Sequence, residues 1–229
     1  ISRKYQYGVL PVSERAMDFV RVEQLLVGSE TKVCYFGMPG SHTQQAMEDF
    51  FGEDVNGISC PTFQRVMEAV EQGEADYGVL PIENSSTGGI TANYDLLLNY
   101  SNSIVGQYVN RIDQCLLAPP GAPLQGIRTV YSHVQGLLQC SSFLHEHPEI
   151  RQVECSDTAS AARKVAADGD VSQAAIAAGR AAKEYGLEVL ADGIQQEKNN
   201  STRFIIIGRN PVYLRDSNKI ALCIVLSHE

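Results

Sequence analysis

The chain has 229 residues, of which 44% are hydrophobic and 20% charged, and this composition excludes disordered, collagen-like and coiled-coil proteins. Eighteen Lys and Arg against 27 Asp and Glu give a net charge of −9, which repels polyanions and argues against nucleic acid as a partner. No apolar run reaches the ~18 residues of a membrane span, so we expect no membrane partner. The six cysteines lie far apart, mostly in apolar stretches, a pattern that predicts reduced thiols and a cytoplasmic protein.

Residues 1–31 lack the regular pattern of the rest of the chain, and we expect a linker or the tail of an upstream domain there. From residue 32 onward, short apolar runs alternate with amphipathic ones. We predict strands at 33–36, 57–60 and 77–82 and helices at 41–51 and 62–72. Such β-α order implies a mostly parallel sheet covered by helices on both faces.

The same order repeats in a second block, with strands predicted at 129–132, 153–155 and 174–177 and helices at 134–145, 158–167 and 180–185. Two long extended runs, 103–118 and 188–207, flank this block. The sequence therefore predicts an α/β protein of two-lobed, periplasmic-binding-protein type II-like architecture, in which two doubly wound, mostly parallel sheets are joined by two crossing strands. We expect lobe 1 to comprise 32–108 and 188–209 and lobe 2 to comprise 109–187, with a ligand cleft between them.

The C-terminal residues 210–229 end on an apolar strand predicted at 220–226. A strand needs partners, and the chain offers none for this one. We therefore expect a linker followed by the first strand of a further, truncated domain.

Two predicted strand-to-helix loops carry a Ser and a Gln three residues apart. In the first, Ser41 and Gln44 have this spacing, so backbone N–H groups near Ser41 and Thr43 would face an anion. The second repeats the design at Ser132 and Gln135, with Gln139 one turn beyond on the same helix face. A plain helix cap would also explain the first pattern, because the S-x-x-Q spacing is common. Two anion sites on facing lobes would suit a ligand with two carboxylates.

His133 lies at the start of the second predicted helix, where a structural imidazole and a binding role are both open. No second His or Cys stands at ligand spacing from it, which argues against a metal site.

Polar residues also border two apolar strands. Glu83 stands directly after the apolar run 79–82, and a partly buried carboxyl group there is either paired or functional. Thr202 and Arg203 precede the very apolar run 204–207, a costly placement unless these side chains bind something. Thr is also a common strand residue, so a structural role for Thr202 stays open.

Taken together, these segments resemble the prephenate dehydratase family over about residues 32–208. Five motifs occur in the family's order: Gly37–Thr43, Pro81–Ser85, Tyr131–Cys140, Asp157–Ala162 and Asn200–Phe204. Residues 215–229 look like the opening of the ACT regulatory domain of this family, and the N-terminal stretch would suit the tail of a fused chorismate mutase, as in bifunctional P-proteins. The chain departs from the family pattern at Val134, which replaces Pro, and at His42, which replaces an aromatic residue.

The resemblance implies a lyase of phenylalanine biosynthesis that converts prephenate to phenylpyruvate with loss of CO2 and the ring hydroxyl, without a cofactor. It implies that Thr202 donates a hydrogen bond to the leaving hydroxyl; Glu83 is the rival acid if burial raises its pKa. Arg203 either holds a carboxylate or locks the hinge. The residues expected to bind the substrate are Ser41, Thr43, Asn84, Ser85, Ser132, His133, Gln139, Asn200, Arg203 and Phe204. Family members are commonly homodimers, and we expect the same here.

Three alternatives stay open at this point. A related enzyme class decarboxylates prephenate without losing the hydroxyl, and arogenate is an alternative substrate for dehydration. The two-lobed plan also serves solute-binding proteins that catalyse no reaction. Because the regulatory domain is expected to be incomplete, we predict activity that is insensitive to phenylalanine.

Overall fold

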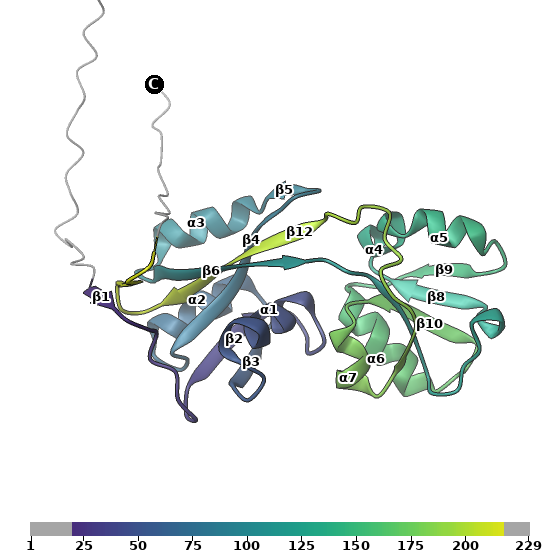
Figure 1. The fold of residues 1–229 in the computed structure, drawn as a ribbon, viewed down its shortest axis with the longest axis horizontal. Coiled ribbons are helices and arrows are strands. Elements are labelled where there is room, and N and C mark those ends of the chain that lie inside the picture. Colours follow the sequence, from purple (N-terminus) through teal and green to yellow (C-terminus); the bar gives the residue numbers. More distant parts are fainter. Residues whose placement is uncertain (1–19, 218–229) are drawn as a thin grey trace, which may run out of the picture.

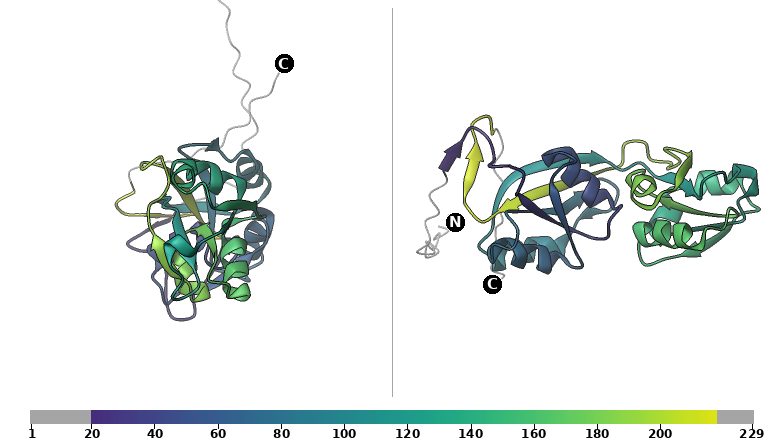
Figure 2. Two further views of the ribbon diagram at one scale, coloured as in Figure 1. Left: turned by 90° about the vertical axis from the view of Figure 1, so that its right-hand side faces the viewer. Right: turned by 90° about the horizontal axis from the view of Figure 1, so that it is seen from below.

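The computed structural model describes residues 20–217, which form two α/β lobes lying beside one another along the long axis (Figures 1 and 2). Lobe 1 contains, in chain order, β2 (Lys32–Phe36), α1 (His42–Phe51), β3 (Asn56–Cys60), α2 (Phe63–Glu71), β4 (Tyr77–Asn84), β5 (Gly88–Gly89), α3 (Thr91–Asn99), β6 (Ser103–Arg111) and β12 (Ser201–Gly208). Its sheet has the strand order β3-β2-β4-β12-β6, with β5 paired to β4.

Lobe 2 contains β7 (Cys115–Ala118), the short 3-10 helix Leu124–Gly126, β8 (Thr129–Ser132), α4 (Val134–Gln139), α5 (Ser141–Glu146), β9 (Arg151–Glu154), α6 (Thr158–Asp168), β10 (Gln173–Ala177), α7 (Arg180–Tyr185) and β11 (Glu188–Ala191). Its sheet has the order β11-β7-β10-β8-β9. Two segments connect the lobes: β6 continues into β7, and the chain returns from β11 to β12 (Figure 1).

Helices cover both faces of each sheet, as the β-α pattern predicts. In lobe 1, Val66, Met67 and Val70 of α2 pack on one face, at the spacing of an amphipathic helix. Ala46 and Met47 of α1 pack on the other face. In lobe 2, α4 and α5 cover one face and α6 and α7 the other. Each lobe therefore has its own core, and the polar contacts between the lobes lie outside both cores.

The predicted fold class is confirmed, but the sheets are mixed. Each five-strand path has two parallel and two antiparallel pairings. The parallel pairs are those of β-α-β units. The antiparallel pairs involve β6 and β12 in lobe 1 and β7 and β11 in lobe 2, because a chain that crosses between lobes must enter and leave each sheet in opposite directions.

Two boundaries differ from the predicted ones. Residues 188–191, predicted to belong to lobe 1, form β11, which pairs with β7 and therefore belongs to the sheet of lobe 2. Residues 20–22, expected in a linker, form strand β1 (Val20–Val22), which pairs in parallel with β13 (Val212–Leu214). The strand predicted at 220–226 lies outside the described residues.

The helix predicted at 134–145 is interrupted at Cys140, where α4 ends and α5 begins. The hydroxyl of Ser141 donates to the carbonyl of Leu138 at 2.9 Å, a local bond that competes with the helical backbone ladder. Within residues 20–217, no helix combines the length and the apolarity that crossing a bilayer requires.

Candidate active site

Thr202 lies at the beginning of β12, at the end of the lobe 1 sheet that faces lobe 2 (Figure 1). The sheet register pairs it with Asn84 of β4 on one side and Asn110 of β6 on the other. Directly paired residues project to the same face of a sheet, so these three polar side chains form one row. Thr202 is only 8% exposed. The row therefore presents two amides and a hydroxyl in a largely buried place.

The Asn84 side chain orients the Thr202 hydroxyl. Asn84 Nδ2 donates to Thr202 Oγ1 at 2.8 Å, while Asn84 Oδ1 accepts from the N–H groups of Ser86 and Thr87 at 2.9 and 3.2 Å. A hydroxyl that accepts a bond still has its single hydrogen to donate. The arrangement thus turns Thr202 into a donor toward whatever lies against this end of the sheet.

Ser85 and Asn200 join the two strands that carry this pair. Ser85 Oγ donates to Asn200 Oδ1 at 3.2 Å and accepts from Ser201 N–H at 2.9 Å. The backbone carbonyl of Asn200 accepts from the N–H of Ile112 at 2.9 Å, in the segment that leaves for lobe 2. These two predicted binding residues therefore hold the strand ends together through Ser85 Oγ and Asn200 Oδ1.

Glu83 is paired, which is one of the two alternatives left open for it, and its side chain is more exposed than expected. Along β12, Arg203 projects to the face opposite Thr202, and Glu83, its register partner, lies there with it. The two form an ion pair at 3.4 Å with side chains 46% and 50% exposed. Glu83 is therefore half-exposed on the face opposite Thr202, and Arg203 is turned away from the row containing Thr202. Phe204, also predicted to bind substrate, is 1% exposed and packs in the core beneath α1.

At the start of α1, Ser41 caps the helix as its spacing with Gln44 predicts: Ser41 Oγ accepts from Gln44 N–H at 3.3 Å. The Gln44 side chain reaches one residue further back than in a capping box and accepts from Gly40 N–H at 2.6 Å. Thr43, in the first turn, is 6% exposed. The structure thus confirms the cap, and the anion site proposed at this helix start stays a prediction.

His42 is the first residue of α1, beside Thr43. Both ring nitrogens are buried and have no hydrogen-bond partner among the described residues. Burial lowers the pKa of His42 to about 4, against an opposing effect of the Asp113 carboxylate, so the imidazole is neutral at pH 7. A neutral ring can donate from one nitrogen and accept at the other.

In lobe 2 the cap residue of α4 is His133, and the expected Ser132 cap is wrong. His133 Nδ1 accepts from Gln135 N–H at 3.2 Å. Ser132 is fully buried and donates to the carbonyl of Ile176 at 2.7 Å. A Cβ at Gly136 would lie 2.5 Å from Ser132 Oγ, so glycine is required to leave this hydroxyl its place. Ser132 Oγ and His133 Nδ1 therefore organise the loop, and the binding roles expected of these two residues stay predictions.

Gln139 reaches the connection between the lobes. Its side-chain oxygen accepts from Gln114 Nε2 at 3.0 Å, and its carbonyl accepts from Gln196 N–H at 2.8 Å. Gln114 N–H in turn donates to the side chain of Gln195 at 2.9 Å, and Gln195 Nε2 donates to Asp113 at 2.7 Å. A chain of amides therefore links α4 to both crossing segments.

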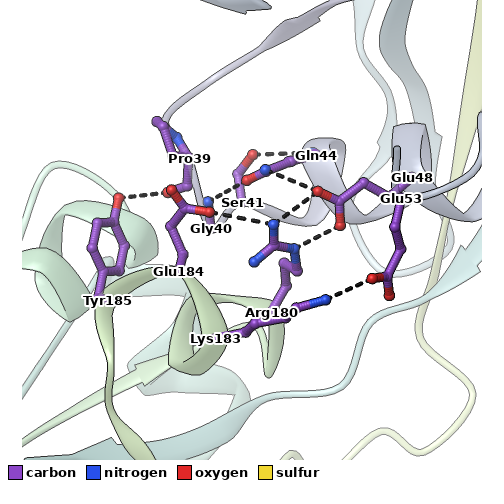
Figure 3. A network of polar contacts seen from close by, with 10 residues as sticks. All are labelled: Pro39, Gly40, Ser41, Gln44, Glu48, Glu53, Arg180, Lys183, Glu184 and Tyr185. Atoms are coloured by element: carbon purple, nitrogen blue, oxygen red, sulfur yellow. Dashed lines mark hydrogen bonds and ion pairs between the residues drawn. The ribbon is translucent and has the colours of Figure 1, made fainter. Parts of the chain in front are cut away.

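A second set of contacts joins the lobes at α1 and α7 (Figure 3). Arg180 Nε and Nη2 of α7 donate to both carboxylate oxygens of Glu48 of α1, at 2.6 and 2.8 Å. Tyr185 Oη donates to the carbonyl of Pro39 at 2.6 Å. Gly40 has φ +83, and a Cβ there would lie 3.1 Å from Ala181. The glycine-containing loop of lobe 1 therefore packs directly on α7 of lobe 2.

Sequence reasoning missed Asn110 and Gln114. Among the described residues, the buried polar side-chain atoms without a partner include His42 Nδ1 and Nε2, Asn110 Nδ2 and Gln114 Oε1. All three residues lie where lobe 1 meets lobe 2, and buried polar atoms without partners are costly unless a ligand satisfies them. A polar Asn and Gln within the extended run 103–118 were the available signal.

Two surface pockets lie away from this region, one of about 260 Å³ between α4, α5 and β9 and one of about 170 Å³ beside β1. In residues 20–217, no cluster of three or more His, Cys, Asp or Glu side chains is arranged to hold a metal ion.

Comparison with known proteins identifies the family. A family model described as prephenate dehydratase matches residues 33–212. The chain belongs to the prephenate dehydratase family.

Two curated relatives and one solved structure illustrate the similarity. Arogenate dehydratase 3 of Arabidopsis thaliana, a chloroplastic protein, is 40% identical over 203 residues, 88% of this chain and 48% of that protein. The bifunctional chorismate mutase/prephenate dehydratase of Neisseria gonorrhoeae is 37% identical over 220 residues, 95% of this chain and 61% of that protein. The prephenate dehydratase of Arthrobacter aurescens, solved in complex with L-Phe, aligns with a TM-score of 0.74 at 32% identity, covering 82% of this chain and 63% of that chain. The chain thus spans about half to three fifths of these relatives.

Proposed function

We propose that this prephenate dehydratase family member converts prephenate to phenylpyruvate. The observation that carries the proposal is the bond from Asn84 Nδ2 to Thr202 Oγ1, which leaves the Thr202 hydroxyl as a donor beside buried, unpartnered polar groups. Membership of the family and the activity for which the relatives from Neisseria gonorrhoeae and Arthrobacter aurescens are named support it.

The reaction needs little acid chemistry from the protein. Prephenate carries a ring carboxylate, a 4-hydroxyl and a pyruvyl side chain with a second carboxylate. When the bond between the ring and its carboxylate breaks, CO2 leaves and the electron pair moves through the ring. The 4-hydroxyl then leaves with the electron pair of its C–O bond, takes up one proton and becomes water. Aromatisation drives the reaction, so positioning and a donor at the departing oxygen suffice.

In this mechanism Thr202 donates a hydrogen bond to the leaving oxygen. A Thr hydroxyl is a weak acid, so it relays a proton from water and does not act as an independent acid. Asn84 sets its direction, and Ser85 and Asn200 fix the strand ends that carry both residues. The carboxylates of the substrate would bind near the start of α1, where the helix dipole favours anions, and near the amides of Gln114 and Gln139. Local donors are needed because the net charge of −9 repels a dianion.

Arogenate, which carries an ammonium group where prephenate has a keto group, is the competing substrate, because the relative from Arabidopsis thaliana is named an arogenate dehydratase. The test is to incubate the 229-residue chain with each compound and to measure phenylpyruvate by ultraviolet absorbance and phenylalanine by chromatography. We expect phenylpyruvate from prephenate. Turnover of arogenate alone would reassign the substrate. A decarboxylated product that keeps its hydroxyl, or tight binding without turnover, would contradict dehydratase activity.

We further propose that the protein acts in phenylalanine biosynthesis in the cytoplasm, as a homodimer. We also propose that these residues belong to a longer polypeptide with chorismate mutase and ACT segments. The bifunctional relative supports the mutase fusion, and the buried free thiols at Cys34, Cys60, Cys115 and Cys140 are compatible with a reducing compartment. Light scattering on the purified protein tests the dimer, and a monomer mass would contradict it.

A further inference from the structure

Asn110 differs from its neighbours in how the fold uses its side chain. It stands next to last in β6, pairs in register with Thr202 and is 7% exposed. Its Nδ2 is buried and has no hydrogen-bond partner among the described residues. Asn84, the matching residue on the other side of Thr202, uses both of its amide atoms within the fold. Asn110 thus holds a buried amide donor that the fold leaves unused, beside the hydroxyl of Thr202, whose hydrogen is also free to donate.

The placement aims this donor group at the same space as Thr202. Tyr108, two residues earlier on β6, projects to the α1 face, where its hydroxyl donates to Asp49 of α1 at 3.1 Å. By strand alternation Asn110 projects to that face as well, toward the start of α1. Side chains of directly paired residues on adjacent strands have Cβ atoms about 4.5–5.5 Å apart. An amide N–H from Asn110 and an O–H from Thr202 can therefore reach one oxygen atom between them.

An unpartnered buried amide costs stability, and a leucine of nearly the same size would avoid that cost. Of the other buried amides nearby, Asn200 accepts from Ser85 and Gln195 bonds to both Gln114 and Asp113, whereas Gln114 Oε1 has no partner among the described residues. A costly polar group that pairs in register with Thr202, close to the unpartnered atoms of His42 and Gln114, points to a ligand that completes it.

We propose that Asn110 is a catalytic residue of the dehydration, donating a second hydrogen bond to the leaving hydroxyl oxygen beside Thr202. This inference rests on the proposed function. As the C–O bond breaks, negative charge develops on the departing oxygen, and two donors held in advance stabilise it as an oxyanion hole does. Asn110 transfers no proton; the proton that turns hydroxide into water comes from solvent through Thr202.

The test compares Asn110→Leu and Asn110→Asp with the unmodified 229-residue chain, using prephenate turnover and thermal unfolding. Both substitutions keep the side-chain size, the first without a donor and the second with an acceptor in its place. We expect each to lower kcat about 100-fold with KM changed less than about threefold, because the bond forms mainly in the transition state. Asn110→Leu should also raise Tm, by about 2–4 °C, because it removes an unsatisfied buried amide.

The matched control is Tyr108→Phe, on the same strand and face, which loses a hydrogen bond to α1 and should leave kcat unchanged. Activity and Tm falling together in Asn110→Leu would indicate a structural role and overturn the inference, as would an unchanged kcat. If Asn110→Leu fails to fold, Asn110→Asp decides by the same kcat criterion. An inactive unmodified chain would overturn the proposed function itself, whereas an active one with an equally active Asn110→Leu variant overturns only the role of Asn110.

Discussion

Arg180 of α7 and Glu48 of α1 form a two-point ion pair across the boundary between the lobes, with N–O distances of 2.6 and 2.8 Å (Figure 3). Their side chains are 16% and 11% exposed, and Gln44 Nε2 also donates to Glu48, at 3.0 Å. Planar, two-point pairing of Arg with a carboxylate is specific in direction as well as strong. This contact therefore sets how the start of α1 lies against lobe 2.

Arg180→Ala should lower the stability of the protein and weaken substrate binding. The change leaves the Glu48 carboxylate largely buried without its cation, which costs about 3 kcal/mol of unfolding free energy. We also expect KM to rise about tenfold, since the lobes would be held together less firmly. The measurements are urea unfolding and steady-state kinetics.

Lys183→Ala is the control for this prediction. It lies on the same helix and also bridges the lobes, through Glu53, but both side chains are more than half exposed. Exposed pairs contribute about 0.2–1 kcal/mol, so stability and KM should change little. Equal effects of the two substitutions would show that the Arg180 pair has no special role.

Thr202→Ala should abolish turnover while changing substrate affinity less than about tenfold, or ~1.4 kcal/mol. The hydroxyl acts on the departing oxygen, which carries charge only in the transition state. Binding of prephenate to the Thr202→Ala variant is measured by calorimetry. Turnover is measured by phenylpyruvate release. Thr202→Ser, which keeps the oxygen bonded to Asn84, should recover part of the activity; a parallel loss of binding and turnover in Thr202→Ala would contradict the assignment.

Glu83→Gln should have little effect on turnover. Glu83 lies on the sheet face opposite Thr202 and pairs with Arg203 at 3.4 Å in a half-exposed position. We expect kcat within about threefold of the unmodified chain and a stability change of at most about 1 kcal/mol. Steady-state kinetics check this. A 100-fold loss of kcat would restore Glu83 as the acid and weaken the case for Thr202.

The neutral state of His42 predicts a pH dependence of stability. Its pKa falls from an ordinary 6.5 to about 4 on folding, because burial disfavours the charged ring. Between these values the unfolded chain binds more protons than the folded one, so this contribution is complete above pH 6.5 and is lost as the pH falls toward 4. Asp113, the nearby carboxylate, opposes the shift.

The measurement is Tm from pH 7 to pH 4.5 for the unmodified chain and for His42→Phe. The decline in Tm should be smaller in His42→Phe, which has no ring to protonate. Identical pH profiles would show that His42 titrates alike in both states.

How much of this could be predicted from sequence depends on the range of the interaction. Most elements of both lobes and the Ser41 cap follow from patterns within a few residues: alternation, helical periodicity and short polar motifs. The family motifs added the chemistry. These features are local, and the physics that produces them acts between near neighbours along the chain.

Only the tertiary structure decided which polar residues meet. Glu83 and Asn84 are adjacent in sequence, yet the register with β12 turns them to opposite faces, so that Asn84 orients Thr202, 118 residues away, and Glu83 does not. Strand register likewise places Asn110 beside Thr202. A hydrogen bond from Gln114 likewise brings Gln139 to the connection between the lobes. Strand register depends on packing between distant segments, and a slip of one residue would exchange the two faces.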